Sequence, residues 1–139
     1  MSPRQALLAL GRGDLALARL DVRDDLDGVE EGLWALDRLA EAGVEVLNAP
    51  SALLCAHDKL LTARSLRRAG LPHPRTVLIE GAAEDLPDLD YPAVVKPRFG
   101  SWGRDVVLCR NRSELEQALA SLASRPWFLS GVLAQELIP

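Results

Sequence analysis

The sequence predicts an α/β to α+β fold in which short strands alternate with helices. Three observations support this class. Hydrophobic residues make up 48% of the 139 residues, enough for a chain of this size to bury a core. Apolar residues recur at helical spacing in some segments and alternate with polar residues in others. Glycines and prolines separate these segments, as they do at the ends of helices and strands.

The first third of the chain is expected to hold two short strands around one helix. Residues 14–20 alternate well enough for a strand, and the acidic residues 21–27 have the composition of a loop. Apolar residues then recur at helical spacing over residues 28–40, and Gly43 is well placed to end that helix. Residues 44–47 form a brief apolar run that predicts the second strand.

Two helices and a strand are expected to follow. Residues 51–56 and 59–69 are predicted helices, and Asp58 can cap the second of them. Residues 76–79 have the β-branched composition of a strand. Residues 80–90 are acidic and predict a solvated loop.

The last third is expected to form a hairpin, a helix and a final strand. Two apolar runs, residues 93–98 and 105–110, flank a short glycine loop, which is typical of a β-hairpin. Ser113 and Glu116 have the spacing of a capping box at the start of a helix. Residues 132–138 predict the last strand.

A lysine inside an apolar strand is the most informative residue of the chain. Strand periodicity places Val94, Lys96 and Arg98 on one face of the strand. Burying an ammonium group costs free energy unless an anion or a carboxylate meets it. Two interpretations stay open: Lys96 faces solvent at a sheet edge, or it points into a cleft and binds phosphate. The glycine loop directly downstream favours the second.

The loop Gly100-Ser101-Trp102-Gly103 follows this lysine. Two of its four residues lack a β-carbon, so its backbone N–H groups can approach a ligand closely. Glycines also occur in ordinary hairpin turns, which is the alternative explanation. Trp102 favours a ligand-covering loop, because a large aromatic side chain at a loop tip is costly to expose. Arg104 is either a second phosphate-binding cation or a surface residue.

Two further segments allow two interpretations each. Lys59 opens a predicted helix, where it is either a surface lysine or part of an anion site at the helix N-terminus. Gln135, Glu136, Leu137 and Ile138 lie in the last predicted strand. They form either a simple alternating strand or a segment whose backbone pairs with the edge of an adenine ring. Spacing alone does not separate these alternatives.

The composition restricts the class of partner. The net charge of −4 and the isoelectric point near 5.2 argue against a general nucleic-acid binder, so a phosphate site must be local. Cys55 and Cys109 are expected to be reduced thiols, and the sequence shows no residues at metal-ligand spacing. It also shows no signal segment and no apolar run that could cross a membrane, so we expect a cytoplasmic protein.

Six motifs in a fixed order resemble the ATP-grasp ligases. They are Asn48-Ala-Pro, His57-Asp-Lys-Leu-Leu-Thr, Ala69-Gly-Leu-Pro-His-Pro-Arg-Thr, Tyr91-Pro-Ala-Val-Val-Lys-Pro, Gly100-Ser-Trp-Gly-Arg and Ala134-Gln-Glu-Leu-Ile. Within that superfamily the chain looks like the branch of the RimK-type glutamate ligases and the LysX-type ligases, and the glycine loop leans towards the LysX-like side. The resemblance covers residues 14–139.

The resemblance implies roles for the candidate residues. Lys59 and Lys96 would contact nucleotide phosphates, and Gly100–Gly103 would close over the triphosphate. Gln135 would lie at the adenine amino group, and Glu136–Ile138 would bracket the adenine edge. ATP is the implied cofactor, together with Mg²⁺ held by a second lobe outside this chain. No catalytic and no metal-ligating residue is implied within the chain itself.

The implied activity is the ATP-dependent ligation of a carboxylate to an amine. ATP would phosphorylate a carboxylate on a small molecule or a protein tail, and the amine of an amino acid would attack the acyl phosphate to form an amide or peptide bond. A non-catalytic nucleotide- or partner-binding module and a plain α+β interaction domain are the alternatives.

The resemblance also implies a domain division. Residues 1–57 would be part of a preceding α/β domain with its linker, and residues 58–139 the N-terminal, nucleotide-side lobe of the ATP-grasp domain, incomplete at the hinge strand. We therefore expect the isolated chain to be inactive. We also expect its last strand to present an open edge through which the chain could associate.

Overall fold

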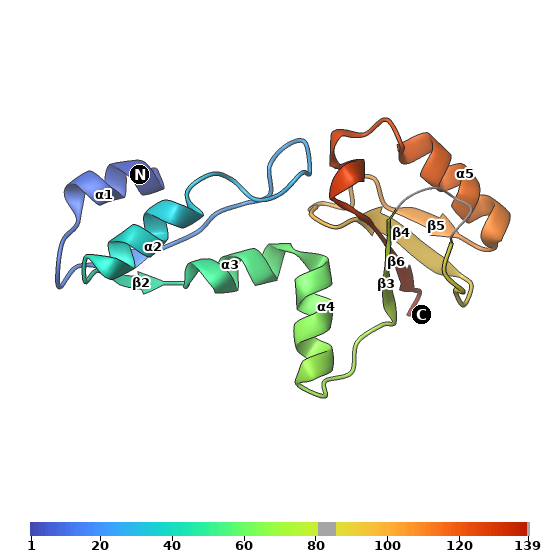
Figure 1. Ribbon diagram of the computed structural model, residues 1–139, viewed down its shortest axis with the longest axis horizontal. Helices are drawn as coiled ribbons and strands as arrows, with labels where there is room; N and C mark the ends of the chain where they lie inside the picture. Colours follow the sequence, from blue (N-terminus) through green and yellow to red (C-terminus); the bar gives the residue numbers. More distant parts are fainter. Residues whose placement is uncertain (81–85, 139) are drawn as a thin grey trace.

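The computed structural model describes residues 1–80 and 86–138, which form two sheets with helices packed on them (Figure 1). Part of the predicted acidic loop at residues 80–90 lies outside the described residues. The elements are α1 (Pro3–Ala9), β1 (Leu15–Leu17), α2 (Leu33–Glu41), β2 (Glu45–Leu47), α3 (Pro50–His57), α4 (Lys59–Arg68), β3 (Thr76–Ile79), β4 (Ala93–Pro97), β5 (Val107–Cys109), α5 (Arg112–Leu122), the 3-10 helix η2 (Pro126–Ser130) and β6 (Val132–Glu136). This alternation confirms the α/β to α+β class.

The first sheet is a parallel pair. In β1 and β2, Leu15 lies opposite Glu45 and Leu17 opposite Leu47. The pairing is parallel because α2 crosses over between the two strands. Helices α1 and α2 cover one face, where Ala6, Leu36 and Leu39 are among the buried residues of one hydrophobic cluster.

Helix α1 was not predicted from the sequence. Ser2 caps it: the Ser2 hydroxyl accepts a hydrogen bond from the Gln5 N–H at 3.3 Å, and Oε1 of Gln5 accepts one from the Ser2 N–H at 2.8 Å. Pro3 stands in the first turn, where its missing N–H costs nothing. The pattern Ser-Pro-x-Gln is a helix start that could have been recognised in the sequence.

The second sheet is antiparallel, in the order β3-β6-β4-β5. Strand β6 lies in its interior, with Gln135 opposite both Thr76 of β3 and Val94 of β4. The expectation of an open edge at the last strand is therefore wrong. The reason is that β6 comes last in the chain but inserts between two earlier strands.

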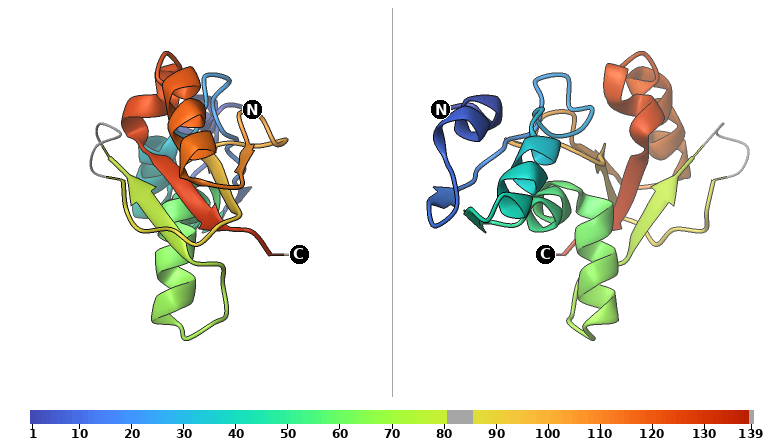
Figure 2. Two further views of the ribbon diagram at one scale, coloured as in Figure 1. Left: turned by 90° about the vertical axis from the view of Figure 1, so that its right-hand side faces the viewer. Right: turned by 60° about the vertical axis from the view of Figure 1, so that its left-hand side comes forward.

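The two faces of this sheet differ. Ala93, Val95 and Pro97 of β4 are buried, whereas the alternate residues Val94 and Lys96 are only half-buried, as strand periodicity predicts. The buried face packs under α5 and η2, in a cluster that includes fully buried leucine and tryptophan side chains (Figure 2). The other face is left free to carry polar side chains.

Local capping agrees with the sequence at α4 and differs at α5. Asp58 caps α4 as predicted, with its carboxylate accepting from the N–H of Leu60 at 3.0 Å and of Leu61 at 3.2 Å. The predicted Ser113–Glu116 capping box is wrong. The cap lies two residues earlier, because the Asn111 side chain already satisfies the Glu114 N–H at 3.0 Å.

The acidic loop after β1 joins the two halves of the molecule. Val22 and Leu26 are buried in the hydrophobic cluster of the second sheet, although they precede that sheet by some fifty residues in sequence. Val29 pairs with Val22 in an isolated bridge, so α2 begins at Leu33 and not at residue 28 as predicted. In the described residues, no helix is both long and apolar enough to span a membrane.

Candidate functional site

A row of polar side chains crosses the free face of the second sheet. The Lys96 ammonium of β4 donates a hydrogen bond to Oε1 of Gln135 on β6. Nε2 of Gln135 in turn donates to the Thr76 hydroxyl on β3 at 2.7 Å. Three adjacent strands thus contribute one residue each, because β6, which carries Gln135, pairs with β3 on one side and with β4 on the other.

Lys96 is half-buried, and its ammonium group points into this row. Strand β4 is interior to the sheet, which excludes the interpretation of a lysine on a solvated edge. Burial lowers the pKa of Lys96 below its usual value, since removal of water disfavours the charged form. Gln135 is a neutral partner, so the ammonium charge is hydrogen-bonded but not compensated by this contact.

A second lysine lies close to the first. Lys59 is the first residue of α4, and its Nζ donates to the backbone carbonyl of Gly100 at 2.7 Å. Burial, and then the positive charge of Lys96, lower the pKa of Lys59 to about 8, against the opposing effect of the Asp58 carboxylate. A half-buried ammonium group whose charge is destabilised by a second one forms a favourable position for an anion.

Asp58 and Arg98 fix the place of α4 relative to β4, a contact that no sequence pattern predicted. The Arg98 guanidinium donates to both carboxylate oxygens of Asp58 at 2.6 to 3.0 Å. The Lys59 N–H also donates to the Arg98 carbonyl at 3.1 Å. The start of α4, including Lys59, is therefore held against the end of β4.

The glycine loop leaves β4 beside these lysines. At Gly100 a β-carbon would lie 3.1 Å from the Pro97 ring, a tight contact, and 3.4 Å from Nζ of Lys59, so the backbone approaches both residues closely. Trp102 is 92% exposed and has a φ of 58°, a left-handed conformation that costs free energy for a residue with a β-carbon. The indole side chain thus covers little in the described part of the free chain.

The far end of the loop is anchored away from the lysines. The Asp105 carboxylate accepts from Nε1 of the buried Trp127 at 2.8 Å and from Arg125 at 3.1 Å. Arg104 donates to the backbone carbonyl of Asp24 at 3.1 Å, so in the free chain it contacts the acidic loop. Ser101 and Gly103 lie between the anchored ends.

The residues after the centre of β6 are engaged with the neighbouring strands. The Glu136 N–H donates to the Arg75 carbonyl at 3.0 Å, and its carboxylate accepts from the Arg75 N–H at 3.1 Å. The Leu137 N–H donates to the Pro92 carbonyl at 3.3 Å. Ile138 is 56% exposed.

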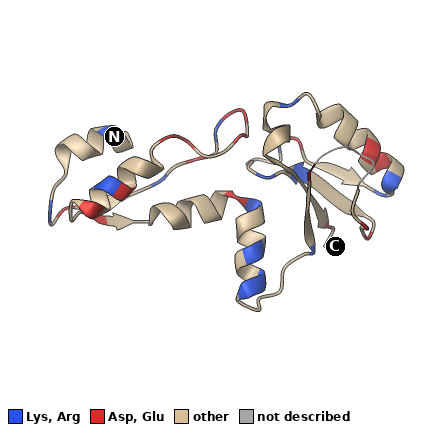
Figure 3. Ribbon diagram, in the orientation of Figure 1, with Lys and Arg blue, Asp and Glu red and all other residues tan. Residues whose placement is uncertain are grey.

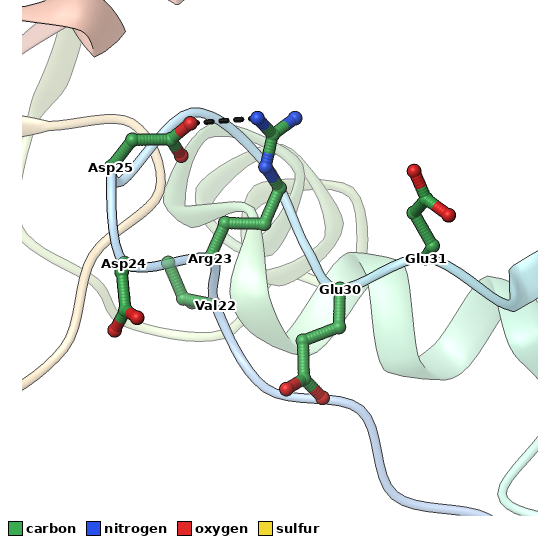
Figure 4. Close-up of a pocket in the computed structure, with 6 residues that line it drawn as sticks. All are labelled: Val22, Arg23, Asp24, Asp25, Glu30 and Glu31. Atoms are coloured by element: carbon green, nitrogen blue, oxygen red, sulfur yellow. Dashed lines mark hydrogen bonds and ion pairs between the residues drawn. The ribbon is translucent and has the colours of Figure 1, made fainter. Parts of the chain in front are cut away.

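A separate hollow in the acidic loop has the wrong charge for a phosphate group (Figure 4). Its lining carries four carboxylates, from Asp24, Asp25, Glu30 and Glu31, and the one cation there, Arg23, is paired with Asp25 at 2.6 Å. Across residues 1–80 and 86–138, no three His, Cys, Asp or Glu side chains group in a way that could hold a metal ion. The magnesium implied by the resemblance therefore finds no fitting donor set in the described part of the chain.

The arrangement is suited to bind a polyanion that carries a hydrogen-bonding base. Basic residues lie on α4 and on the sheet (Figure 3), and hydrogen bonds join the start of α4 to the chain that follows β4. Lys59 and Lys96 supply positive charge, the glycine loop supplies backbone groups, and Gln135 supplies an amide. The sequence predicted each of these residues, and the structure brings Lys59, Lys96, Gly100 and Gln135 together through hydrogen bonds and charge coupling.

Comparison with known proteins gives matches along the whole chain. The family described as RimK-like ATP-grasp domain matches residues 56–139. The N5-carboxyaminoimidazole ribonucleotide synthase of Synechococcus elongatus is 34% identical over 97% of this chain and 35% of that protein. The glutamate–LysW ligase ArgX of Sulfolobus acidocaldarius is 33% identical over 74% of this chain and 36% of that protein.

A solved structure shares the fold. The carboxyaminoimidazole ribonucleotide synthase of Aspergillus clavatus superposes with a TM-score of 0.69 at 20% identity, over 97% of this chain and 34% of that chain. The chain thus spans about a third of the length of the relatives that it matches.

Proposed function

The chain belongs to the RimK-like ATP-grasp domain family, and from that premise we propose that it is the nucleotide-binding part of an ATP-dependent carboxylate–amine ligase. The observation that carries the proposal is the meeting of Lys59 and Lys96 beside the glycine loop, next to Gln135. Two neighbouring ammonium groups favour a polyphosphate as the ligand. The amide of Gln135 suits a nucleobase.

The residues would act by position and charge. Lys59 and Lys96 would neutralise the negative charge of the nucleotide phosphates, including the charge that develops on the leaving β-phosphate as the terminal phosphoryl group passes to a substrate carboxylate. Lys96 would exchange its contact with Gln135 for one with phosphate. Residues 100–103 would close over the triphosphate, and Trp102 would exclude water from it.

The adenine ring would lie against the end of β6. Gln135 would meet its amino group. The N–H groups of Glu136 and Leu137 already donate to neighbouring strands, so Ile138 would carry the backbone contact with the adenine edge. Mg²⁺, when bound, would neutralise phosphate charge. Its ligands would come from outside the described residues.

The substrates are proposed by class. ArgX is named as a glutamate–LysW ligase, and a second relative, from Methanosarcina acetivorans, is named as a tetrahydromethanopterin:α-L-glutamate ligase. These names support an acceptor carboxylate on a small molecule or protein tail and an amino acid amine as the second substrate. Residues 1–57 would belong to the preceding α/β domain and residues 58–139 to the ATP-grasp lobe.

Trapping of the acyl phosphate tests the function. The full-length protein, incubated with ATP, Mg²⁺, hydroxylamine and a panel of carboxylates, is expected to release ADP and to form a hydroxamate with its cognate acid. AMP and pyrophosphate as products would contradict the mechanism. ATP binding without turnover on any carboxylate would favour the alternative of a non-catalytic nucleotide-binding module.

A further inference from the structure

Thr76 links the polar row to a backbone carbonyl at the edge of the sheet. Its hydroxyl donates to the Pro74 carbonyl at 2.9 Å, and the same oxygen lies 2.7 Å from Nε2 of Gln135. A hydroxyl has a single hydrogen, and a carbonyl oxygen can only accept. The Thr76 oxygen must therefore accept from the Gln135 amide nitrogen.

The contact of Gln135 with Lys96 requires the same orientation of the amide group as the contact with Thr76. Lys96 is its partner there, and an ammonium group can only donate. Oε1 of Gln135 must then face Lys96, and Nε2 must face Thr76. Both neighbours thus select one of the two orientations that an amide side chain can adopt.

The two neighbours differ once a nucleotide is bound, if the proposed function holds. Lys96 would turn towards the phosphates and release Oε1 of Gln135. Thr76 would then be the remaining contact that fixes the amide. A free Oε1 can accept from an N–H donor, such as the 6-amino group of adenine. It offers no donor to the 6-carbonyl group of guanine.

We propose that Thr76 is a positioning residue for nucleobase specificity: it holds the Gln135 amide so that its oxygen selects a 6-aminopurine over a 6-oxopurine. This inference rests on the proposed function. Thr76 itself does not touch the base. Without its hydroxyl, the Gln135 amide could rotate and present its nitrogen to the carbonyl of guanine.

Three variants of the full-length protein test this role. Thr76→Val removes the hydroxyl and keeps the β-branched shape, whereas Thr76→Ser keeps the hydroxyl. Ser121→Ala is the control, because its hydroxyl donates to the Ala118 carbonyl within α5, under the opposite face of the sheet. Calorimetric titration with ATP and with GTP gives the ratio of the two Kd values for each protein.

The expected result is a change in the ratio. Loss of one positioned hydrogen bond should lower the GTP-to-ATP ratio of Kd values by roughly three- to tenfold in Thr76→Val. Thr76→Ser and Ser121→Ala should keep the wild-type ratio. A purely structural role would lower the unfolding temperature and weaken both nucleotides equally.

The outcomes separate the two proposals. An unchanged ratio in Thr76→Val, with wild type preferring ATP, would overturn the role of Thr76 and leave the proposed function intact. Wild type that binds neither nucleotide would overturn the proposed function, and the role of Thr76 with it. Equal binding of ATP and GTP by wild type would overturn the role of Thr76 alone.

Discussion

The Arg98 guanidinium donates hydrogen bonds of 2.6 to 3.0 Å to the Asp58 carboxylate, and that carboxylate also caps α4. The Asp58 side chain is only 1% exposed, whereas that of Arg98 is 28% exposed. A buried carboxylate requires such compensation, because removing it from water is costly. The pair therefore decides where the helix that carries Lys59 begins and how it meets β4.

Replacing Asp58 should destabilise the chain more than a typical surface change. Asp58→Ala removes a helix cap and leaves Arg98 without its partner, so we expect a loss of about 2–4 kcal/mol in the free energy of unfolding. Asp58→Asn keeps the capping oxygen but puts an NH2 group in place of the oxygen that accepts from Nη2 of Arg98. It keeps the cap and loses the ion pair, so its cost should be smaller than that of Asp58→Ala. Urea denaturation measures both.

A matched control distinguishes the loss of the Asp58 contacts from the general effect of replacing an aspartate. Asp37 is exposed on α2, and Asp37→Ala should change the unfolding free energy by less than about 0.5 kcal/mol. If Asp58→Ala and Asp37→Ala cost the same, the ion pair does not hold α4 in place.

Nucleotide binding should weaken at alkaline pH because of Lys59. Its pKa is lowered to about 8, so the free protein loses this ammonium as the pH rises above 8. Phosphate binding requires the charged form, and the proton must then be taken up again. The affinity for ATP should fall by up to about tenfold per pH unit above pH 8, and stay level below it.

Lys59→Arg identifies the group responsible. A guanidinium stays charged over this range, so the variant should show a flatter pH profile from pH 7.5 to 9.5 even if its affinity at pH 7 is lower. A decline that is as steep in Lys59→Arg as in wild type would assign the effect to another group.

The free energy of unfolding of the free chain should rise with pH above 8, whereas the affinity for ATP should fall. The pKa of Lys59 is about 8 in the folded chain and near 10.5 without burial, so the unfolded state binds more protons between these values. The stability of the free chain should therefore rise with pH from about 8 to 10.5, and the penalty is fully present below pH 8. Lys59→Met should be more stable than wild type at pH 7, and this advantage should shrink towards pH 10.5. An advantage that does not depend on pH would contradict the assignment to the lysine charge.

Local patterns were enough to predict the elements that carry the site. The strands at Thr76–Ile79 and Ala93–Pro97 and the helix after Asp58 follow from β-branched composition, alternation and a capping side chain. The contact of Arg98 with Asp58 joins residues 40 positions apart, and that of Gln135 with Thr76 joins residues 59 apart. The Gln135 contact depends on the strand order β3-β6-β4, and the Arg98 contact on how the start of α4 meets the chain after β4; periodicity encodes neither.

Trp102 should contribute to nucleotide binding and not to the stability of the free chain. Its side chain is 92% exposed and its φ is 58°, so Trp102→Gly should be neutral or stabilise the free protein by about 1 kcal/mol. The same variant should bind ATP more weakly if the loop closes over the nucleotide. Trp127→Phe provides the contrast, since it removes the buried N–H donor to Asp105 and should lower stability. Unchanged ATP affinity in Trp102→Gly would contradict a covering role.

Lys96 should bind ATP through its charge, and Arg98 is an unsuitable comparison for it although both residues follow the same strand periodicity. Arg98→Ala would disturb Asp58 and so would move Lys59, which mixes structural and binding effects. Arg112 offers a better control, because it is exposed on α5 and, within residues 1–80 and 86–138, forms an ion pair only with Glu116, at 3.0 Å. Lys96→Met keeps the length of the side chain and removes a charge-assisted contact, so the Kd for ATP should rise on the order of 10- to 100-fold.

Relief of a buried charge should at the same time leave the free protein as stable as wild type or more so, since burial lowers the pKa of Lys96. Weaker ATP binding together with retained stability would be specific to a lysine that serves a ligand, and equal Kd values for Lys96→Met and Arg112→Met would show that it does not.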